Sequence, residues 1–498
     1  MSTAGEQAIR FLLDGKIVSV TGVPATLTVL QYLREVAGRT GTKEGCAEGD
    51  CGACTVVLGR LDTDGERVSY RAINACIRLL ATIDGHELVT VESLQEQQVL
   101  HPVQRAMIDQ HASQCGFCTP GFVMSLFALY LQGAEQPRAR VIEALAGNLC
   151  RCTGYRPIVE AGCRMHDYPA PLEWHAGASI SPAHVQPLRQ LRRTSALRLP
   201  GFRAPRTLDE LTDALQEWPD ALLLAGGTDV GLWITKQLRE PTRIVYLGEV
   251  AELRTLERDA RQLRIGAAVT LTDAWAALVQ EWPVLAEFAQ RFGSPPIRNS
   301  GTLGGNVANG SPIGDSIPVL IALGAGVELR SGRQVRRLAL DELYLGYQQQ
   351  SRAAGEFISA LLVPLASANQ LVAAYKLAKR FEQDISGVCV AVAVRRDGTR
   401  VLEARIAYGG MAAVPARARS AEACLQRAGW CAAGIEAAAA AVAEDFRPLS
   451  DQRASAGYRL QAAANLLRRF YLRQEGGDEV LGVFDDRLAA LAAAAPAD

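Results

Sequence analysis

The chain has 498 residues, a formal net charge of −1 and a pI near 6.6. This balance provides no basic surface for nucleic acid and no cationic face for an acidic membrane, so neither partner is expected. The longest apolar run, Phe122–Leu131, is too short to span a bilayer, and the N-terminus lacks the uninterrupted apolar stretch of a signal peptide. We therefore expect a soluble cytoplasmic protein, in which clustered cysteines bind metal more often than they form disulfides.

The first ninety residues or so have the pattern of a small β-rich domain. An Asp14-Gly15 pair between two short apolar runs predicts a tight hairpin turn. The elements expected here are strands Ile9–Leu13 and Ile17–Val20, a helix from Thr26 to near Gly38, a glycine-rich loop Gly41–Gly52 and a strand Thr55–Leu58. The next segment changes to helical spacing, which predicts a small all-helical unit. Its expected helices are His101–His111, Pro120–Leu131 and Val141–Leu149.

A proline-rich stretch, Tyr168–Pro205, is typical of a loop, so we expect residues 166–195 to be a linker. The remainder has an α+β pattern that changes near residue 370. Expected strands are Leu222–Leu224, Ile244–Tyr246, Leu263–Ile265, Val388–Arg395 and Arg405–Tyr408, and expected helices are Thr270–Gln280, Ile435–Glu444 and Arg453–Arg473.

Two tetrads of cysteines carry the strongest chemical signal. The first has the spacing Cys46-x4-Cys51-x2-Cys54, with Cys76 arriving from a separate element. This is the spacing of plant-type [2Fe–2S] ferredoxins, whereas a structural zinc site usually uses paired C-x2-C units. Small residues around the first three cysteines let backbone amides approach the sulfurs. We expect a [2Fe–2S] cluster here.

The second tetrad is Cys115, Cys118, Cys150 and Cys152. Its C-x2-C and C-x-C pairs could hold zinc as well as a second cluster. Pro120 is placed to begin a helix, which would put the Cys118 thiolate near the positive end of the helix dipole. The other cysteines have no ligand-like spacing and are expected to be idle thiols; they are Cys163, Cys389, Cys424 and Cys431.

Two glycine-rich loops could cradle a diphosphate. No G-x-G-x-x-G pattern is present, so a Rossmann fold is not supported. One loop follows a predicted strand at 223–230, and the other lies at 299–306. Consecutive glycines expose backbone N–H groups that can bind an anion, although ordinary tight turns have the same composition.

The cysteine segments GCAEGDCGACTV, QCGFCTPGF and NLCRCTGYRPI resemble the iron–sulfur signatures of the molybdenum hydroxylases, the family of xanthine dehydrogenase. The resemblance implies a multidomain α+β protein with a β-grasp ferredoxin-like [2Fe–2S] domain at 1–92 and an all-α [2Fe–2S] domain of four-helix type at 93–165. After the linker it implies an α+β FAD-binding domain of the vanillyl-alcohol-oxidase type at 196–368. A C-terminal domain like that of carbon monoxide dehydrogenase flavoprotein is expected at 369–485, followed by a tail at 486–498.

The segments AGGTDVGLW and IRNSGTLGGNVANGSPIGD resemble the two FAD loops of the same family. By this resemblance, the pyrophosphate and ribose would be held by Leu223, Leu224, Ala225, Gly226, Gly227, Thr228, Asp229 and Val230 and by Thr302, Leu303, Gly304, Gly305 and Asn306. Phe292 would lie near the isoalloxazine ring, and Asp315 would hydrogen-bond FAD. Ile358 would flank the ring and Lys376 would reach the cofactor. Plain core packing is the alternative for Phe292 and Ile358.

These assignments use the whole chain and leave no room for a molybdenum–pterin domain. The resemblance therefore implies the iron–sulfur/FAD small subunit of a split bacterial xanthine dehydrogenase, which takes electrons from a large molybdenum-cofactor-binding partner during hypoxanthine or xanthine oxidation. Both clusters and FAD would be resident, NAD⁺ would be the acceptor, and the hydroxylation site would lie on the partner. A heterotetramer with two copies of each subunit is implied. Alternatives are the same subunit of an aldehyde, N-heterocycle or carbon monoxide hydroxylase, a stand-alone FAD oxidase, and a non-catalytic zinc scaffold.

Overall fold

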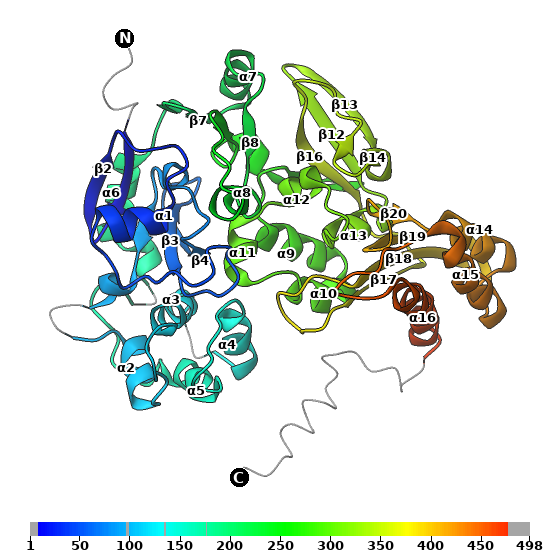
Figure 1. Ribbon diagram of the computed structural model, residues 1–498, viewed down its shortest axis with the longest axis horizontal. Coiled ribbons are helices and arrows are strands. Elements are labelled where there is room, and N and C mark those ends of the chain that lie inside the picture. The colour runs from blue at the N-terminus through cyan, green and yellow to red at the C-terminus, as the bar shows by residue number, and fades with distance from the viewer. Residues whose placement is uncertain (1–7, 96–98, 134–135, 176, 477–498) are drawn as a thin grey trace. The chain divides into compact units, whose positions relative to one another are not determined.

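The computed structural model describes residues 8–95, 99–133, 136–175 and 177–476 (Figure 1). The predicted tail, 486–498, lies outside these residues. The chain divides into two compact units. The first comprises residues up to Arg254 with 270–272 and 293–302, and the second comprises 255–269, 273–292 and everything from Leu303 onward.

The N-terminal part of the first unit is a five-stranded sheet in the order β2-β1-β5-β3-β4. Its strands are β1 (Ile9–Leu13), β2 (Lys16–Val20), β3 (Thr55–Leu61), β4 (Val68–Asn74) and β5 (Glu87–Val89). Strand β1 pairs in parallel with β5, and the other pairings are antiparallel. Asp14 and Gly15 both have positive φ, which confirms the predicted hairpin turn. The predicted helix is a short α1 (Val29–Gln31) that continues as a π-helix, Tyr32–Val36.

Four helices follow, and their apolar core includes Val57, Ala72 and Val89 from β3, β4 and β5. The helices are α2 (Pro102–Asp109), α3 (Thr119–Tyr130), α4 (Arg138–Leu145) and α5 (Arg156–Arg164). Helix α3 is buried from Gly121 to its end, which explains its continuous apolar sequence. A proline stands in the first turn of α2, α3 and α5, where the missing N–H has no helical partner to lose.

The prediction of a loop-like linker at 166–195 is wrong for its second half. Helix α6 (Pro182–Leu191) occupies this region and buries Val185, Leu188 and Leu191 in an apolar cluster with Leu12 and Val68. The prediction treated the prolines as signals of a loop. Pro182 instead stands in the first turn of α6, a position that proline favours. The segment is therefore a packed part of the first unit.

The first unit ends in a four-stranded sheet with the order β6-β7-β9-β8. Its elements are β6 (Leu197–Leu199), β7 (Phe202–Ala204), α7 (Leu208–Glu217), β8 (Leu222–Leu224), α8 (Val230–Thr235), β9 (Ile244–Tyr246) and, from the later segment, α11 (Pro295–Ser300). Strands β8 and β9 have the predicted bounds. They pair in parallel, so the loop after β8 lies at the carboxyl edge of the pair.

The second unit begins with a five-stranded antiparallel sheet, β10-β11-β16-β12-β13, of which Figure 1 labels β12, β13 and β16. The strands are β10 (Leu256–Arg258), β11 (Gln262–Gly266), β12 (Gly326–Ser331), β13 (Gln334–Ala339) and β16 (Phe357–Pro364), with a small pair β14 (Tyr344–Gly346) and β15 (Gln349–Gln350). The accompanying helices are α9 (Leu271–Glu281, its first two residues counted with the first unit), α10 (Ala286–Gln290), α12 (Leu303–Asn309) and α13 (Ser316–Ala322).

The C-terminal part is a sheet β17-β18-β19-β20 covered by helices α14, α15 and α16 (Figure 1). The bounds are β17 (Gln370–Leu377), β18 (Val388–Asp397), β19 (Arg400–Gly409), β20 (Ala416–Arg417), α14 (Arg419–Ala428), α15 (Ala432–Asp445) and α16 (Ala456–Gln474). Alternate valines of β18 pack into the core between the sheet and the helices. Within the described ranges, every helix is too short or too polar to cross a lipid bilayer.

Arg459 on α16 ties three segments of this part together. The residue is 3% exposed, donates to the carbonyl groups of Gly387 and Gly410, and binds both oxygens of Asp451 at 2.8 Å. Arg468 on the same helix instead pairs with Glu436 at the surface. Arg459→Met should lower the free energy of unfolding by about 2–4 kcal/mol, because buried carbonyls lose a charged donor. Arg468→Met should cost at most about 1 kcal/mol.

Urea unfolding followed by circular dichroism measures both variants against the parent chain. Equal losses for Arg459→Met and Arg468→Met would show that the buried contacts contribute nothing beyond a surface ion pair.

Candidate iron–sulfur and flavin sites

The first cysteine tetrad gathers where the glycine-rich loop meets β3 and β4. The Sγ of Cys46 accepts three backbone N–H groups at 3.4 Å, from Glu48, Asp50 and Cys51. Such donors stabilise a thiolate. A Cβ on Gly45 would lie 2.8 Å from the Cys51 sulfur, so the loop needs small residues at this position, as its composition predicts.

The four thiols of this tetrad interact directly with one another. Hydrogen bonds from the thiols of Cys51 and Cys76 hold the pKa of Cys46 far below its ordinary value. The same contacts raise the pKa of Cys51 and of Cys76, while the Cys76 thiol lowers the pKa of Cys54. Cys54 and Cys76 are buried. These mutual contacts place the four sulfurs close together, as the ligands of one cluster must be.

The second tetrad lies between the helices of the all-α part. Its thiols approach in two pairs, Cys118 with Cys150 and Cys115 with Cys152. Burial and then the Cys150 thiol raise the pKa of Cys118 to about 12. For Cys150, burial is outweighed by donors from Thr153 and the Cys152 backbone, so its pKa falls.

The surroundings of the second tetrad are more open than those of the first. Cys115 and Cys152 are exposed, as are the apolar side chains of Phe117, Leu149 and Tyr155, at 49%, 42% and 40%. In the described residues no three His, Cys, Asp or Glu side chains form a group that could hold a single metal ion. The thiols of the second tetrad instead lie in two interacting pairs, and a two-iron cluster binds two thiolates at each iron.

A backbone contact joins the two cysteine loops. The Leu149 N–H, next to Cys150, donates to the carbonyl oxygen of Cys51 at 3.0 Å. The Asn148 side chain donates to the Gly52 carbonyl at 3.1 Å and accepts from Ser125 at 2.6 Å. Sequence reasoning missed Asn148, Leu149 and Ser125 as linking residues. The only available signal was that Asn148 and Leu149 directly precede a ligand pair.

Glycine is required on both sides of this contact. A Cβ on Gly52 would lie 2.1 Å from the Gly147 carbonyl oxygen, and a Cβ on Gly121 would lie 2.1 Å from the Gly52 carbonyl oxygen. Gly52 also has a φ of +68°. The backbones of the two cysteine loops are therefore in direct contact at Gly52, with no room for a side chain between them.

The first cysteine loop also contacts the segment that follows the first flavin loop. Ile77, directly after Cys76, fills the space beside Gly49 and Gly231, where an added Cβ would lie 2.6 Å from Ile77 atoms. The Thr235 hydroxyl on α8 donates to the Ala47 carbonyl at 2.7 Å. The structure thus brings the first tetrad next to the loop 223–230, which ends at α8.

The first flavin loop packs against the start of the second within the first unit. A Cβ on Gly226 would lie 2.2 Å from the Ser300 carbonyl oxygen and 2.5 Å from the Gly301 Cα, and Gly227 has a φ of +79°. Thr302 forms a β-bridge with Thr270. The loop 223–230 is therefore a tight backbone cradle of the kind that a diphosphate requires.

The remaining flavin candidates belong to the second unit. Leu303, Gly304, Gly305 and Asn306 form the start of α12, where a Cβ on Gly304 would lie 2.5 Å from the Ala267 Cα. The Asn306 side chain accepts from Ser316. Phe292 and Ile358 are 8% and 5% exposed, and Phe292 packs against Trp275 with ring centres 5.4 Å apart. Core packing explains both residues without a cofactor, so their flavin role stays a prediction.

Asp315 has the feature expected of a cofactor-binding group. Lys376 Nζ donates to its Oδ2 at 2.8 Å, and both side chains are almost fully buried. The other oxygen, Oδ1, is buried and has no hydrogen-bond partner among the described residues. An unsatisfied buried carboxylate oxygen is costly and calls for a donor. A flavin N–H would fit this oxygen, so the residues present are compatible with FAD.

Comparison with known proteins identifies each part of the chain. Residues 11–80 match a 2Fe-2S iron-sulfur cluster binding domain, and 90–163 match a [2Fe-2S] binding domain. Residues 197–366 match the FAD binding domain in molybdopterin dehydrogenase, and 373–474 match the CO dehydrogenase flavoprotein C-terminal domain. The chain has the iron–sulfur and FAD architecture of the molybdenum hydroxylase family. The predicted fold class is confirmed, and the architecture supports two [2Fe–2S] clusters and FAD as cofactors.

Members of this family resemble the chain over most of its length. Xanthine dehydrogenase of Emericella nidulans is 33% identical over 94% of this chain, and that of Drosophila pseudoobscura pseudoobscura is 35% identical over 81%. The chain spans only 38% and 34% of the length of these curated relatives.

Solved structures of the family resemble about half of the chain. Carbon monoxide dehydrogenase from Hydrogenophaga pseudoflava aligns with a TM-score of 0.51 and 29% identity, covering 54% of this chain and 94% of that chain. Quinoline 2-oxidoreductase from Pseudomonas putida 86 aligns with a TM-score of 0.50 and 27% identity, covering 55% and 95%. In both structures the matched chain is therefore covered almost completely by about half of this one.

The close approach at Gly52 can be tested with a matched pair of glycines. Gly154 has the same φ of +68° and lies two residues after Cys152, but nothing lies within 4 Å of a Cβ built on it. Gly52→Ala should separate the two cysteine loops and lower the iron content of the purified chain. Gly154→Ala should cost only backbone strain, about 1–2 kcal/mol, and retain iron. Equal iron loss in both variants would contradict the steric role of Gly52.

Proposed function

We propose that the chain is the iron–sulfur and flavin electron-transfer subunit of a xanthine dehydrogenase. It would carry electrons from a molybdenum centre through two [2Fe–2S] clusters to FAD and on to NAD⁺ during purine oxidation. The observation that carries the proposal is the unbroken series of contacts from the second tetrad, through Leu149 and Cys51, to Ile77 and the first flavin loop. When bound, FAD accepts electrons singly and passes a hydride to nicotinamide, which iron–sulfur clusters do not do.

The residues of this chain have separate tasks in the proposal. Both tetrads bind clusters through thiolates that backbone and side-chain donors stabilise, with Cys46 and Cys150 receiving the most donors among those described. The loop 223–230 and residues 302–306 bind the diphosphate of FAD. Asp315, fixed by Lys376, accepts a hydrogen bond from the flavin. Burial of Cys54 and Cys76 excludes water from the middle of the series.

The molybdenum centre is proposed to lie on a large partner subunit, in a heterotetramer with two copies of each chain. The carbon monoxide dehydrogenase and quinoline 2-oxidoreductase comparisons support a division among chains, because almost a whole chain there corresponds to only about half of this one. The exposed apolar side chains beside Cys115 and Cys152 support the helical part, above all 150–158, as the face that meets the partner.

Xanthine as the substrate rests on the relatives in Emericella and Drosophila. A second candidate is the same subunit of another molybdenum hydroxylase, which the carbon monoxide dehydrogenase and quinoline 2-oxidoreductase structures favour. Assays of the assembled enzyme with xanthine, an aldehyde, a quinoline and carbon monoxide distinguish these possibilities.

Metal and flavin analysis of the purified chain tests the cofactors. We expect four iron, four acid-labile sulfides and one FAD per chain, because two tetrads and one pair of flavin loops are present. The chain without its partner should still bind FAD and reduce dyes with NADH, but should not oxidise xanthine. Zinc in place of iron at the second tetrad would contradict the two-cluster proposal. Xanthine oxidation by the chain alone would contradict the partner subunit.

The order of the electron path can be tested at the first tetrad. Replacing Cys46, Cys51, Cys54 or Cys76 with Ala should remove one cluster and abolish substrate-driven NAD⁺ reduction by the assembled enzyme. NADH oxidation by an artificial acceptor at the flavin should continue, because that reaction bypasses the clusters. Electron paramagnetic resonance shows which cluster is lost. If both activities vanish in a folded variant that retains FAD, the proposed order is wrong.

A further inference from the structure

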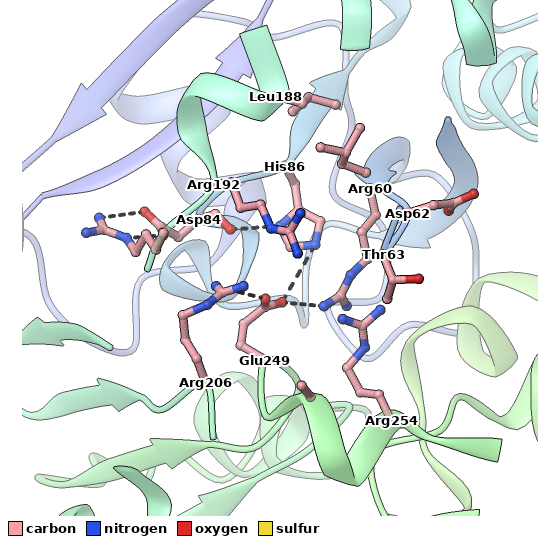
Figure 2. A pocket seen from close by; sticks show the side chains of 14 residues that line it. Arg60, Asp62, Thr63, Asp84, His86, Leu188, Arg192, Arg206, Glu249 and Arg254 are labelled. Carbon is pink, nitrogen blue, oxygen red and sulfur yellow. Dashed lines mark hydrogen bonds and ion pairs between the residues drawn. The ribbon is translucent and has the colours of Figure 1, made fainter. Parts of the chain in front are cut away.

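A pocket of about 110 Å³ in the first unit is lined by five arginines. It lies between the end of β3, the turn before β5, helix α6 and the segment after β9, and none of its lining residues is a candidate cysteine or flavin residue. Figure 2 shows the side chains of Arg60, Arg192, Arg206 and Arg254 gathered around His86 and Glu249. The fifth arginine is Arg193.

Three of these arginines have carboxylate partners. Arg60 donates to Glu249 Oε1 at 2.8 Å, and Arg206 donates to Glu249 Oε2 at 3.4 Å. Arg193 binds both oxygens of Asp84, at 2.5 and 3.0 Å. The single carboxylate of Glu249 therefore pairs with both Arg60 and Arg206.

The other two arginines, Arg192 and Arg254, form no ion pair among the described residues. Among the described residues, no carboxylate lies within ion-pairing distance of Arg192, which is exposed, or of Arg254, although Glu249 and Asp62 attract Arg254 from further away. Arg254 is partly buried and faces Arg60; burial and then the Arg60 charge lower its pKa to about 10. It remains charged at neutral pH. Keeping a guanidinium against another cation is unfavourable unless an anion joins them.

The lining as a whole has an excess of positive charge. Its five arginines face the carboxylates of Asp62, Asp84 and Glu249. His86 adds no charge at neutral pH, because burial lowers its pKa to about 4. The excess is two positive charges, which a dianion would balance.

We propose that this pocket binds the dianionic phosphoryl group of a small ligand, with Arg192 and Arg254 as its principal donors and Arg60 beside them. Guanidinium groups match phosphate oxygens through paired N–H donors, and they bind phosphate better than a point charge does. The cavity has room for a phosphate group and leaves the rest of a larger ligand outside. Free phosphate and the terminal phosphate of a nucleotide share this chemistry.

A bound phosphoryl group would connect three segments of the first unit. Arg60 belongs to the ferredoxin-like sheet, Arg192 follows α6, and Arg254 follows β9. A ligand that binds only the folded arrangement stabilises it in proportion to its saturation. The pocket therefore links ligand concentration to the stability of the part of the chain that carries the electron path. The inference does not depend on the proposed function.

Calorimetric titration of the purified, cofactor-loaded chain tests the proposal, with inorganic phosphate, AMP and adenosine as probes. We expect saturable binding of one phosphate or one AMP, no binding of adenosine at this site, and a higher melting temperature with phosphate than with chloride at equal ionic strength. Arg254→Gln and Arg192→Gln should each weaken binding about tenfold or more, because a charged hydrogen bond is lost. Arg198→Gln, an exposed arginine outside the pocket, is the matched control and should bind as the parent does.

Only binding that Arg254→Gln weakens is assigned to the pocket, which separates it from AMP binding at the nicotinamide site. Equal affinity for phosphate and AMP identifies free phosphate as sufficient, and tighter AMP binding identifies a nucleotide. Failure of phosphate and AMP both to bind and to stabilise the parent chain would overturn the proposal. Equal weakening in Arg254→Gln and Arg198→Gln would overturn it as well, because the effect would then be one of net charge.

Discussion

The backbone hydrogen bond from Leu149 to Cys51 is the contact on which the first unit depends. It requires that two cysteine loops meet without side chains between them, and Gly52 and Gly121 satisfy this requirement. Helix α3 begins at Thr119, so the same contact fixes where the helical part joins the ferredoxin-like sheet. Asn148 and Ser125 then satisfy the polar groups that the close approach buries. Electron transfer needs short separations, and the close backbone packing at Gly52 and Gly121 produces one between the two cysteine loops.

The environment changes systematically along the series of contacts. Cys115 and Cys152 are exposed, whereas Cys54 and Cys76 are buried, and Ile77 continues the buried region toward α8. In the proposed function, the open end is the one that the partner subunit would cover. A buried middle suits centres that should not react with solvent. Phe117, Leu149 and Tyr155, each within three residues of a cysteine of the second tetrad, are exposed as well.

Local signals in the sequence were sufficient to single out the two groups of interacting cysteines, the Asp14-Gly15 turn and the strands β8 and β9. These features depend on spacing and on neighbouring residues, which a sequence displays directly. The linker prediction failed because prolines begin helices as well as interrupt loops, and only the packing of Val185 and Leu188 distinguishes the two cases. Asn148 could not be assigned because its partners lie more than twenty residues away, on segments that only the fold brings together.

The ion pair between Asp315 and Lys376 is another contact that the sequence could not predict. The two residues are 61 positions apart, and nothing in either local sequence indicates an ion pair. Burying such a pair offsets much of its own attraction, so stability alone gives little reason to keep it. The free Oδ1 of Asp315 supplies another reason, because a carboxylate held by Lys376 presents a charged, fixed acceptor to whatever binds beside it. Binding of a further group by Asp315 therefore explains the presence of this buried pair better than a contribution to stability does.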